Sequence, residues 1–232
     1  MRLDVMHRMS LPQTMDLFQP DHEQVPLAPG RESLGAGAML LRRRAAPDAI
    51  SLLADLQAVL ERAPLRQMVT PGGFRMSVAM SNCGALGWVS DSTGYRYDAV
   101  DPDSGQHWPA MPASFLRLAR LAAAEAGFAG FEPDACLVNR YEPGARLTLH
   151  QDRNERDFGQ PIVSVSLGLP AVFLFGGSKR SDRPVRVPLV HGDVVVWGGP
   201  ARLRYHGVLA LGQGQHALTG NFRFNLTLRR AA

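Results

Sequence analysis

The C-terminal half of the chain is a series of short strand-forming runs with no segment of helical period among them. This feature constrains the fold more than any other. The candidate strands are residues 137–141, 147–152, 162–169, 172–175, 185–189, 194–197, 203–208 and 222–229. About eight short strands at this spacing are typical of an antiparallel jelly-roll barrel. We therefore expect a mainly β fold with its barrel core at about residues 134–230.

Two amphipathic helices are expected ahead of the barrel. Residues 48–62 and 112–126 place apolar side chains at helical spacing, with Pro64 ending the first helix and Gly127 suited to cap the second. These helices should flank the barrel. The expected fold class is thus mainly β with flanking helices (α+β).

The other segments are a predicted flap and a predicted arm. Residues 65–109 hold strand-like runs at 76–80 and 94–97 that are broken by glycines, which is typical of a flap built from hairpins. Residues 1–37 are rich in Met, Pro, Gly and polar residues without sustained periodicity, so we expect a mobile arm. A chain of 232 residues with 45% apolar content suits one core, so residues 38–232 should form a single domain.

Composition excludes some classes of protein. No apolar run reaches the length of a membrane span, and residues 1–30 have charges and prolines where a signal peptide needs an apolar core. We therefore expect a cytoplasmic protein that makes no membrane contact. Cys83 and Cys136 lack a metal-ligand spacing and are expected to be reduced, buried thiols. The net charge of +4 permits a polyanionic partner without identifying one.

A metal site is predicted at the end of the strand 147–152. Residues two apart in a strand point to the same side, so His150 and Asp152 would present an imidazole and a carboxylate together. A second histidine would complete a facial triad with open positions for Fe(II) chemistry, although a zinc hydrolase can use the same ligands. His206 is the preferred third ligand because it lies in a predicted strand.

Three other residues compete for this assignment. The 191–193 segment, His-Gly-Asp, has the same spacing as the metal pair, but its glycine and the strand that follows predict a tight turn. His191 and His216 are also alternatives to His206, yet both lie in glycine-containing turns.

The last strand predicts an acid-binding pocket. Its even positions are Phe or Leu, and its odd positions include Arg223, Asn225, Thr227 and Arg229. If the apolar face enters a hydrophobic layer, the polar face lies either in solvent or in a polar barrel interior. In the interior each guanidinium would need a partner, and a dicarboxylic acid would supply two carboxylates.

A second strand supports the interior location. Leu137, Asn139 and Tyr141 share one face of the strand 137–141, so an amide and a phenol would join the same pocket.

These residues together resemble the AlkB-type Fe(II)- and 2-oxoglutarate-dependent dioxygenases, which repair alkylated nucleic acid. The resemblance covers nearly all of the chain from about Asp16 on. It is carried by residues 66–73, 134–137, 139–141, 150–152, 162–170, 191–199, 205–207 and 223–229. It implies a double-stranded β-helix (jelly-roll) with a nucleotide-recognition lid at about residues 65–109.

The resemblance also implies roles for individual residues. Fe(II) would be held by His150, Asp152 and His206. The 2-oxoglutarate pocket would be lined by Leu137, Asn139, Tyr141, Ser164, Arg223, Asn225, Thr227 and Arg229, with Arg223, Asn139 and Tyr141 on the distal carboxylate and Arg229 and Asn225 near the end bound to iron. The nucleotide would lie near Thr70, Met80, Trp88, Tyr95, Asn154 and Arg180, with Trp88 stacked on the damaged base against His150.

The implied reaction is oxidative demethylation of 1-methyladenine and 3-methylcytosine, with O2 as cosubstrate and formaldehyde, succinate and CO2 as products. The implied partner is alkylated DNA, with single strands preferred to duplexes and RNA as an alternative, and the protein is expected to be a monomer. Two further hypotheses stay open: the same chemistry on RNA or protein, and a catalytically silent barrel that binds nucleic acid.

Two segments depart from the family pattern or add to it. Many members have an acidic residue two places after the metal carboxylate, where this chain has Asn154. Residues 13–18 loosely resemble peptides that bind the bacterial sliding clamp, although they contain one residue too many.

Overall fold

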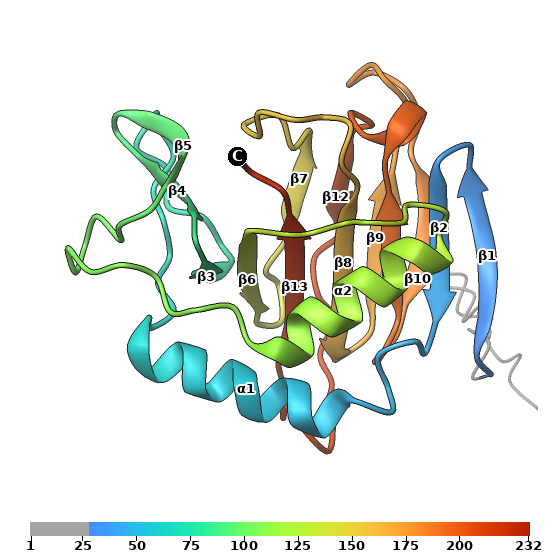
Figure 1. Ribbon diagram of the computed structural model, residues 1–232, viewed down its shortest axis with the longest axis horizontal. Coiled ribbons are helices and arrows are strands. Elements are labelled where there is room, and N and C mark those ends of the chain that lie inside the picture. The colour runs from blue at the N-terminus through green and yellow to red at the C-terminus, as the bar shows by residue number, and fades with distance from the viewer. Residues whose placement is uncertain (1–27) are drawn as a thin grey trace, which may run out of the picture.

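Two antiparallel sheets pack face to face in the computed structural model, which describes residues 28–232 (Figure 1). The larger sheet contains, in spatial order, β1 (Gly30–Gly35), β2 (Ala38–Arg42), β11 (Val194–Trp197), β8 (Ile162–Gly168), β13 (Arg223–Arg229), β6 (Ala135–Tyr141) and β3 (Ala79–Gly84). The smaller contains β10 (Val185–Leu189), β9 (Ala171–Phe175), β12 (His206–Val208) and β7 (Leu147–His150). This arrangement confirms the predicted jelly roll.

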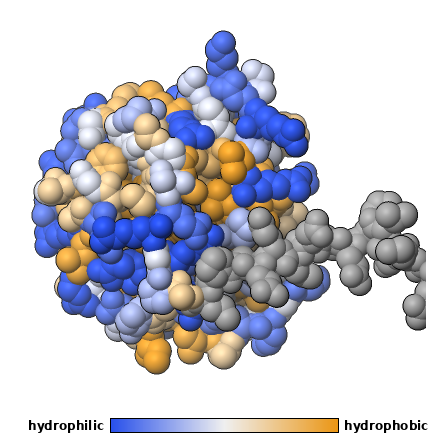
Figure 2. All heavy atoms as spheres, turned by 90° about the vertical axis from the view of Figure 1, so that its right-hand side faces the viewer, coloured by the Kyte–Doolittle hydropathy of each residue, from blue (hydrophilic) through white to orange (hydrophobic). Residues whose placement is uncertain are grey.

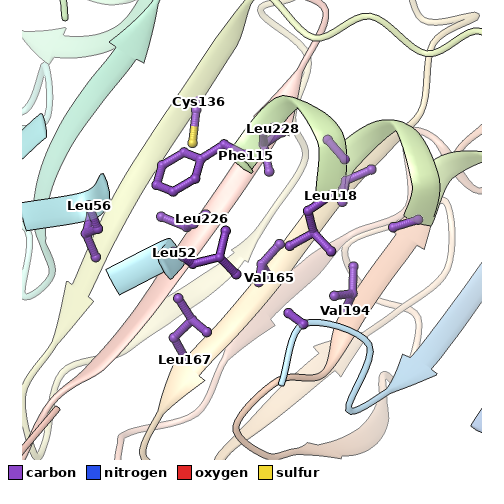
Figure 3. Close-up of a cluster of buried hydrophobic side chains, with 14 of the residues drawn as sticks. Leu52, Leu56, Phe115, Leu118, Cys136, Val165, Leu167, Val194, Leu226 and Leu228 are labelled. Carbon is purple, nitrogen blue, oxygen red and sulfur yellow. The ribbon is translucent and has the colours of Figure 1, made fainter. Parts of the chain in front are cut away.

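Two helices cover the outer face of the larger sheet. They are α1 (Ala49–Arg62) and α2 (Ala113–Glu125), so both predicted helices are confirmed. Their apolar stripes meet the sheet in one buried cluster, in which Leu52 and Phe115 lie beside Leu226 (Figure 3). Neither helix has a side chain that caps its first turn. Burial of this apolar layer is therefore the interaction that stabilises the helices against the sheet.

Strand β13 packs one face against the two helices and turns its other face away from them. Its even residues Leu226 and Leu228 are fully buried in the cluster below the helices, whereas Arg223 and Arg229 are buried on the other face. Successive side chains of a strand alternate between faces, so the arginines point between the two sheets. The alternative of a solvent-exposed polar face is therefore wrong.

A short hairpin lies at one end of the sandwich. It consists of β4 (Gly87–Asp91) and β5 (Gly94–Asp98), which form a separate two-stranded sheet within the described part of the chain (Figure 1). The side-chain amide of Asn82 in β3 ties the hairpin to the large sheet, because it accepts from the Trp88 backbone N–H and donates to the Trp88 carbonyl (both 3.0 Å).

Strand boundaries in the predicted flap differ from the structure. The strand expected at 76–80 is instead β3, Ala79–Gly84, which pairs with β6 in the large sheet. Strand β3 is the last strand of that sheet, and its polar residues Ser81 and Asn82 concealed its β character in the sequence. Both are buried, and local hydrogen bonds satisfy them, including one from Ser81 Oγ to the Ala63 carbonyl (2.5 Å).

The N-terminal boundary also differs. Part of the predicted arm 1–37 is β1, which pairs with β2 at the edge of the large sheet. Its charged residues Arg31 and Glu32 suit an edge strand, and they concealed its β character in the sequence. Hydrophilic and hydrophobic side chains are intermixed on the face of the molecule beside this edge (Figure 2). The clamp-like segment 13–18 lies outside the described residues.

Two strands of the small sheet are shorter than expected. The run 147–152 ends as a strand at His150, so Asp152 follows the strand rather than lying in it. The run 203–208 forms a strand only over His206–Val208, because the turns after Gly199–Ala201 occupy its first residues. Within residues 28–232 no helix has both the length and the apolar character needed to cross a membrane.

Candidate metal centre

The two histidines of the predicted triad are direct neighbours across the small sheet. His206 in β12 pairs in register with His150 at the end of β7, and their ring centres are 4.4 Å apart. Gly207 permits this close approach, because a Cβ there would lie 2.7 Å from the Leu147 carbonyl oxygen of β7. The pairing of β12 with β7 therefore places the histidines on one site.

Asp152 completes the group from the loop after β7. Its Oδ1 lies 3.7 Å from His150 Nε2 and its Oδ2 lies 3.6 Å from His206 Nε2. Among residues 28–232 this is the one cluster of three such side chains with ligand atoms close enough to share an ion. The side chains converge even though Asp152 lies beyond the strand.

Both histidines are oriented as ligands. His150 Nδ1 lies 2.8 Å from the Thr148 carbonyl and His206 Nδ1 lies 3.0 Å from the Arg204 carbonyl. A carbonyl only accepts, so each Nδ1 carries the proton and each Nε2 offers a lone pair toward Asp152. Burial and the nearby His206 lower the pKa of His150 to about 4, which keeps its ring neutral and able to bind metal.

The competing histidines form a different structure. His191 and His216 stack on each other with ring centres 4.5 Å apart. Asp193 is fully buried and accepts from the Arg42 side chain and the Arg43 N–H (both 2.9 Å). The 191–193 turn thus stabilises the fold, and its carboxylate is already paired.

A network of buried charges holds Asp152 in place. Arg229 donates to Asp152 Oδ2 from Nε (2.9 Å) and Nη2 (2.5 Å), and Arg202 donates to the Asp152 carbonyl (2.8 Å). Burial alone would raise the pKa of Asp152, but Arg229 and the two histidines hold it well below its ordinary value. The carboxylate is therefore ionised, as a metal ligand must be.

Glu155 supports the same network, and sequence reasoning missed it. Its carboxylate lies within 3.3 Å of both Arg229 and Arg202 and accepts from the Tyr97 hydroxyl at 2.7 Å. Burial raises the pKa of Tyr97, so this hydroxyl stays a donor. The available signal was a carboxylate three residues beyond Asp152, but nothing in the sequence indicated that it would be buried between two arginines.

Arg223, at the far end of β13, has hydrogen-bonding capacity that the protein does not use. The guanidinium is fully buried, yet it makes one hydrogen bond, from Nη2 to Ser166 Oγ (3.0 Å), and lies 4.9 Å from the Tyr141 ring centre. Among residues 28–232, its Nε and Nη1 have no hydrogen-bond partner, and neither has Asn139 Oδ1. Burial lowers the pKa of Arg223, and a bound carboxylate would satisfy the free donors.

The other predicted pocket residues lie farther along β13 and on the two strands beside it. Asn225 Nδ2 donates to Ser164 Oγ (2.8 Å), and Asn225 Oδ1 accepts from Asn139 (3.2 Å) and Thr227 (2.9 Å). Leu137 is buried opposite Thr227 in the pairing of β6 with β13. The structure therefore brings the predicted acid-binding residues of β6, β8 and β13 together.

The charge of Asp152 in the metal cluster and the charge of Arg223 both act on the hydroxyl of Tyr141. Burial and, to a smaller degree, the Asp152 charge raise the pKa of Tyr141 to about 12, while Arg223 opposes this rise. A dicarboxylic acid placed between them would meet the triad at one end and Arg223 at the other. The triad's donor set, two imidazoles and one carboxylate, fits Fe(II) and leaves positions open for such a ligand.

The predicted nucleotide contacts are brought together only in part. Trp88 stacks on Tyr95 (5.6 Å between ring centres, 14° between planes), and Trp88 Nε1 donates to Asn154 Oδ1 at 3.2 Å. Met80 is buried, and it belongs to the core cluster against which Trp88 packs. Thr70 is half-buried in a turn, with its hydroxyl accepting from the Phe74 N–H.

Arg180 lies apart from these residues. It is exposed in the loop between β9 and β10, and no hydrogen bond or ion pair in the described part of the chain links it to the hairpin.

Comparisons with known proteins agree with this geometry. Residues 38–229 match the profile of the 2OG-Fe(II) oxygenase superfamily. Alpha-ketoglutarate-dependent dioxygenase AlkB of Salmonella typhimurium is 56% identical over 218 residues, covering 94% of this chain and 98% of that protein. The protein of the same name from Escherichia coli is 57% identical over 203 residues, covering 88% and 94%. A solved structure of OsALKBH1 is similar with a TM-score of 0.76 at 27% identity, covering 87% of this chain and 100% of that one.

Proposed function

The chain belongs to the AlkB-type dioxygenases of the 2OG-Fe(II) oxygenase superfamily, and we propose on that premise that it removes methyl groups oxidatively from alkylated bases of nucleic acid. As a member of this family it is an Fe(II)- and 2-oxoglutarate-dependent dioxygenase that uses O2. The observation that carries the proposal is the buried Arg223, whose free donors share an interior with the triad.

The proposed metal ligands are His150, Asp152 and His206. Their neutral imidazoles and ionised carboxylate would leave Fe(II) with a net positive charge that attracts an anionic cosubstrate. Arg229 fixes the Asp152 carboxylate through two hydrogen bonds to one oxygen, so the other oxygen, Oδ1, is available to the metal.

The proposed 2-oxoglutarate site extends from the metal to Arg223. The distal carboxylate would accept from the unpartnered Nε and Nη1 of Arg223, beside Asn139 and Tyr141, with Leu137, Ser164 and Thr227 completing the lining and Arg229 and Asn225 at the end nearer the metal. With Fe(II) bound, the cosubstrate and O2 supply the oxidation of the N-methyl C–H bond, and the products are succinate, CO2 and formaldehyde.

The proposed substrates are 1-methyladenine and 3-methylcytosine in DNA. Their methyl groups lie on the Watson–Crick edge, so the base must leave the stack, and a lesion that cannot pair lowers that cost. Single strands should therefore be preferred. The β4–β5 hairpin would act as a lid, in which Trp88 offers an aromatic face for stacking beside His150.

The test is turnover with purified protein, Fe(II), ascorbate, 2-oxoglutarate and an oligonucleotide that contains 1-methyladenine. We expect formaldehyde release and loss of the methyl mass in intact-mass analysis, and no turnover in Asp152→Ala. RNA and methylated peptide of equal concentration serve as competing substrates. Demethylation of the peptide alone, or 2-oxoglutarate-independent binding of DNA without turnover, would refute the proposal.

A further inference from the structure

Two histidines outside the metal centre stack on each other. His191, in the turn between β10 and β11, and His216, in the turn before β13, have ring centres 4.5 Å apart with 28° between their planes. The His191 ring accepts a hydrogen bond from the backbone N–H of Gly168, the residue that pairs with Arg223. Because the triad contacts the Arg229 end of β13, the stacked pair lies at the other end of this strand, away from the metal centre.

The hydrogen bonds of the stacked pair fix the position of the proton on each ring. His191 Nδ1 accepts from the Gly168 N–H (3.0 Å), and His216 Nδ1 accepts from the Leu218 N–H (3.2 Å). A backbone N–H can only donate, so each neutral ring carries its proton on Nε2. No hydrogen bond within residues 28–232 uses either Nε2. The two neighbouring rings therefore hold two unused N–H donors.

This placement of the protons opposes binding of a metal ion. A metal would need the Nε2 lone pair, so each ring would have to move its proton to Nδ1. That proton would then face a backbone N–H, and both backbone hydrogen bonds would be lost. In the triad, Nδ1 of each histidine instead faces a carbonyl, which leaves Nε2 free for a metal. The stacked pair is thus suited to donate to an anion.

The charged groups beside the pair also favour an anion. Arg43 acts on His191 electrostatically, and its guanidinium forms no hydrogen bond or ion pair in the described part of the chain. The carboxylate that acts on His191 is that of Asp193, which is fully buried and accepts from Arg42 and from two backbone N–H groups. Burial, His216 and Arg43 together lower the pKa of His191 to about 4. The carboxylate is occupied, whereas the Arg43 guanidinium is available to an incoming anion.

We propose that His191, His216 and Arg43 form a binding site for a phosphate group, separate from the catalytic centre and independent of the proposed function. Each imidazole would donate from Nε2, and the guanidinium would supply positive charge and further donors. Three donor groups suit an ion with three acceptor oxygens, which a phosphomonoester has and a carboxylate lacks. The phosphodiesters of a nucleic-acid backbone have two unbridged oxygens each, so free phosphate or a phosphomonoester fits the site better.

NMR of the histidine rings tests the site in the full chain saturated with Zn(II) and 2-oxoglutarate, which fill the metal centre and keep phosphate from it. Potassium phosphate is compared with potassium chloride at equal ionic strength. We expect phosphate to shift the His191 and His216 signals in a saturable way and to raise the pKa of His191, because a bound anion favours the protonated ring. The ring of His107, which is exposed between β5 and α2, should not respond.

His216→Asn is the matched variant, because the Asn Oδ1 can still accept from the Leu218 N–H while the Nε2 donor is lost. Loss of one hydrogen bond to a charged group should weaken phosphate binding about tenfold or more, and Arg43→Gln should have a similar effect. His107→Asn removes an imidazole elsewhere and should leave the affinity unchanged.

Three results would overturn the inference: no saturable shift in the wild-type protein, wild-type phosphate affinity in both His216→Asn and Arg43→Gln, or an equal response of the His107 ring. An oligonucleotide without terminal phosphates serves as the second ligand. If it shifts the two rings and inorganic phosphate does not, the assignment to a phosphomonoester is wrong. None of these readouts depends on demethylation, so the proposed function can fail or hold separately.

Discussion

Replacing Arg223 with methionine tests whether the buried guanidinium is reserved for a ligand. The substitution removes one hydrogen bond from a charged donor to Ser166, a loss of about 1.5–3 kcal/mol, and a cation–π contact with Tyr141 of about 0.5–2 kcal/mol. It also removes a desolvated charge whose Nε and Nη1 are unpartnered, which costs several kcal/mol in the ligand-free protein. The opposing contributions are of similar size, so the free energy of unfolding without ligand should change by less than about 2 kcal/mol.

The ligand-bound protein should behave differently. At a 2-oxoglutarate concentration about 100 times the Kd, wild-type protein gains about 2.7 kcal/mol, or about 5–11 °C in Tm for a domain of this size. Arg223→Met should lose most of this gain, because the distal carboxylate would lack its charged partner.

Thermal unfolding with Mn(II) in place of Fe(II), with and without 2-oxoglutarate, measures both quantities. Arg186→Met is the matched control, since Arg186 is exposed on β10, and it should retain the full shift. A ligand-free Arg223→Met that is destabilised by about 3–5 kcal/mol, the cost of breaking a paired buried charge, would show that Arg223 serves the fold rather than a ligand.

Three further predictions concern other parts of the molecule. Glu155→Gln should weaken Mn(II) binding about tenfold or more, because it removes charge from the network that orients Asp152; titration by calorimetry measures this, and wild-type affinity would contradict it. Burial, together with the stacked histidine, lowers the pKa of His191 to about 4, below the unfolded value, so the unfolded state binds more protons between about pH 6.5 and 4 and stability falls as the pH drops through that window. His191→Asn, which can still accept from Gly168, should flatten urea midpoints over this window, and an unchanged slope would count against the assignment. Leu226→Ala should cost about 2–5 kcal/mol of unfolding free energy in urea, since Leu226 is fully buried under the helices, and a loss below about 1 kcal/mol would contradict its place in the core.

Patterns within single segments were the most informative part of the sequence. The alternation in β13 predicted an apolar face and a polar face but left the polar face either in solvent or in the barrel interior, and the burial of Leu226 and Arg223 decides for the interior. Local spacing also predicted both helices to within a residue at each end. These features depend on periodicity, which a sequence displays directly.

Features that depend on contacts between distant segments could not be predicted in the same way. Strand β3 contains Ser81 and Asn82, whose partners are Ala63 at the end of α1 and Trp88 in the β4–β5 hairpin. Glu155 becomes a buried network residue only because Arg202 and Arg229 come from segments far along the chain. A polar residue in the sequence is read as exposed unless its partner is known, so such positions were missed or left without a role.

The two faces of β13 have separate consequences for function. The even face packs under α1 and α2 and supplies hydrophobic stabilisation, which permits the odd face to bury two arginines, one of them only partly satisfied. Because a buried unpaired charge is unfavourable, the free protein retains an affinity for carboxylate that a fully satisfied interior would lack. Substitutions on the even face should therefore lower stability with little effect on ligand affinity per folded molecule, whereas substitutions at Arg223 should do the reverse. Since the faces alternate residue by residue, one strand permits both outcomes to be compared in the same structural context.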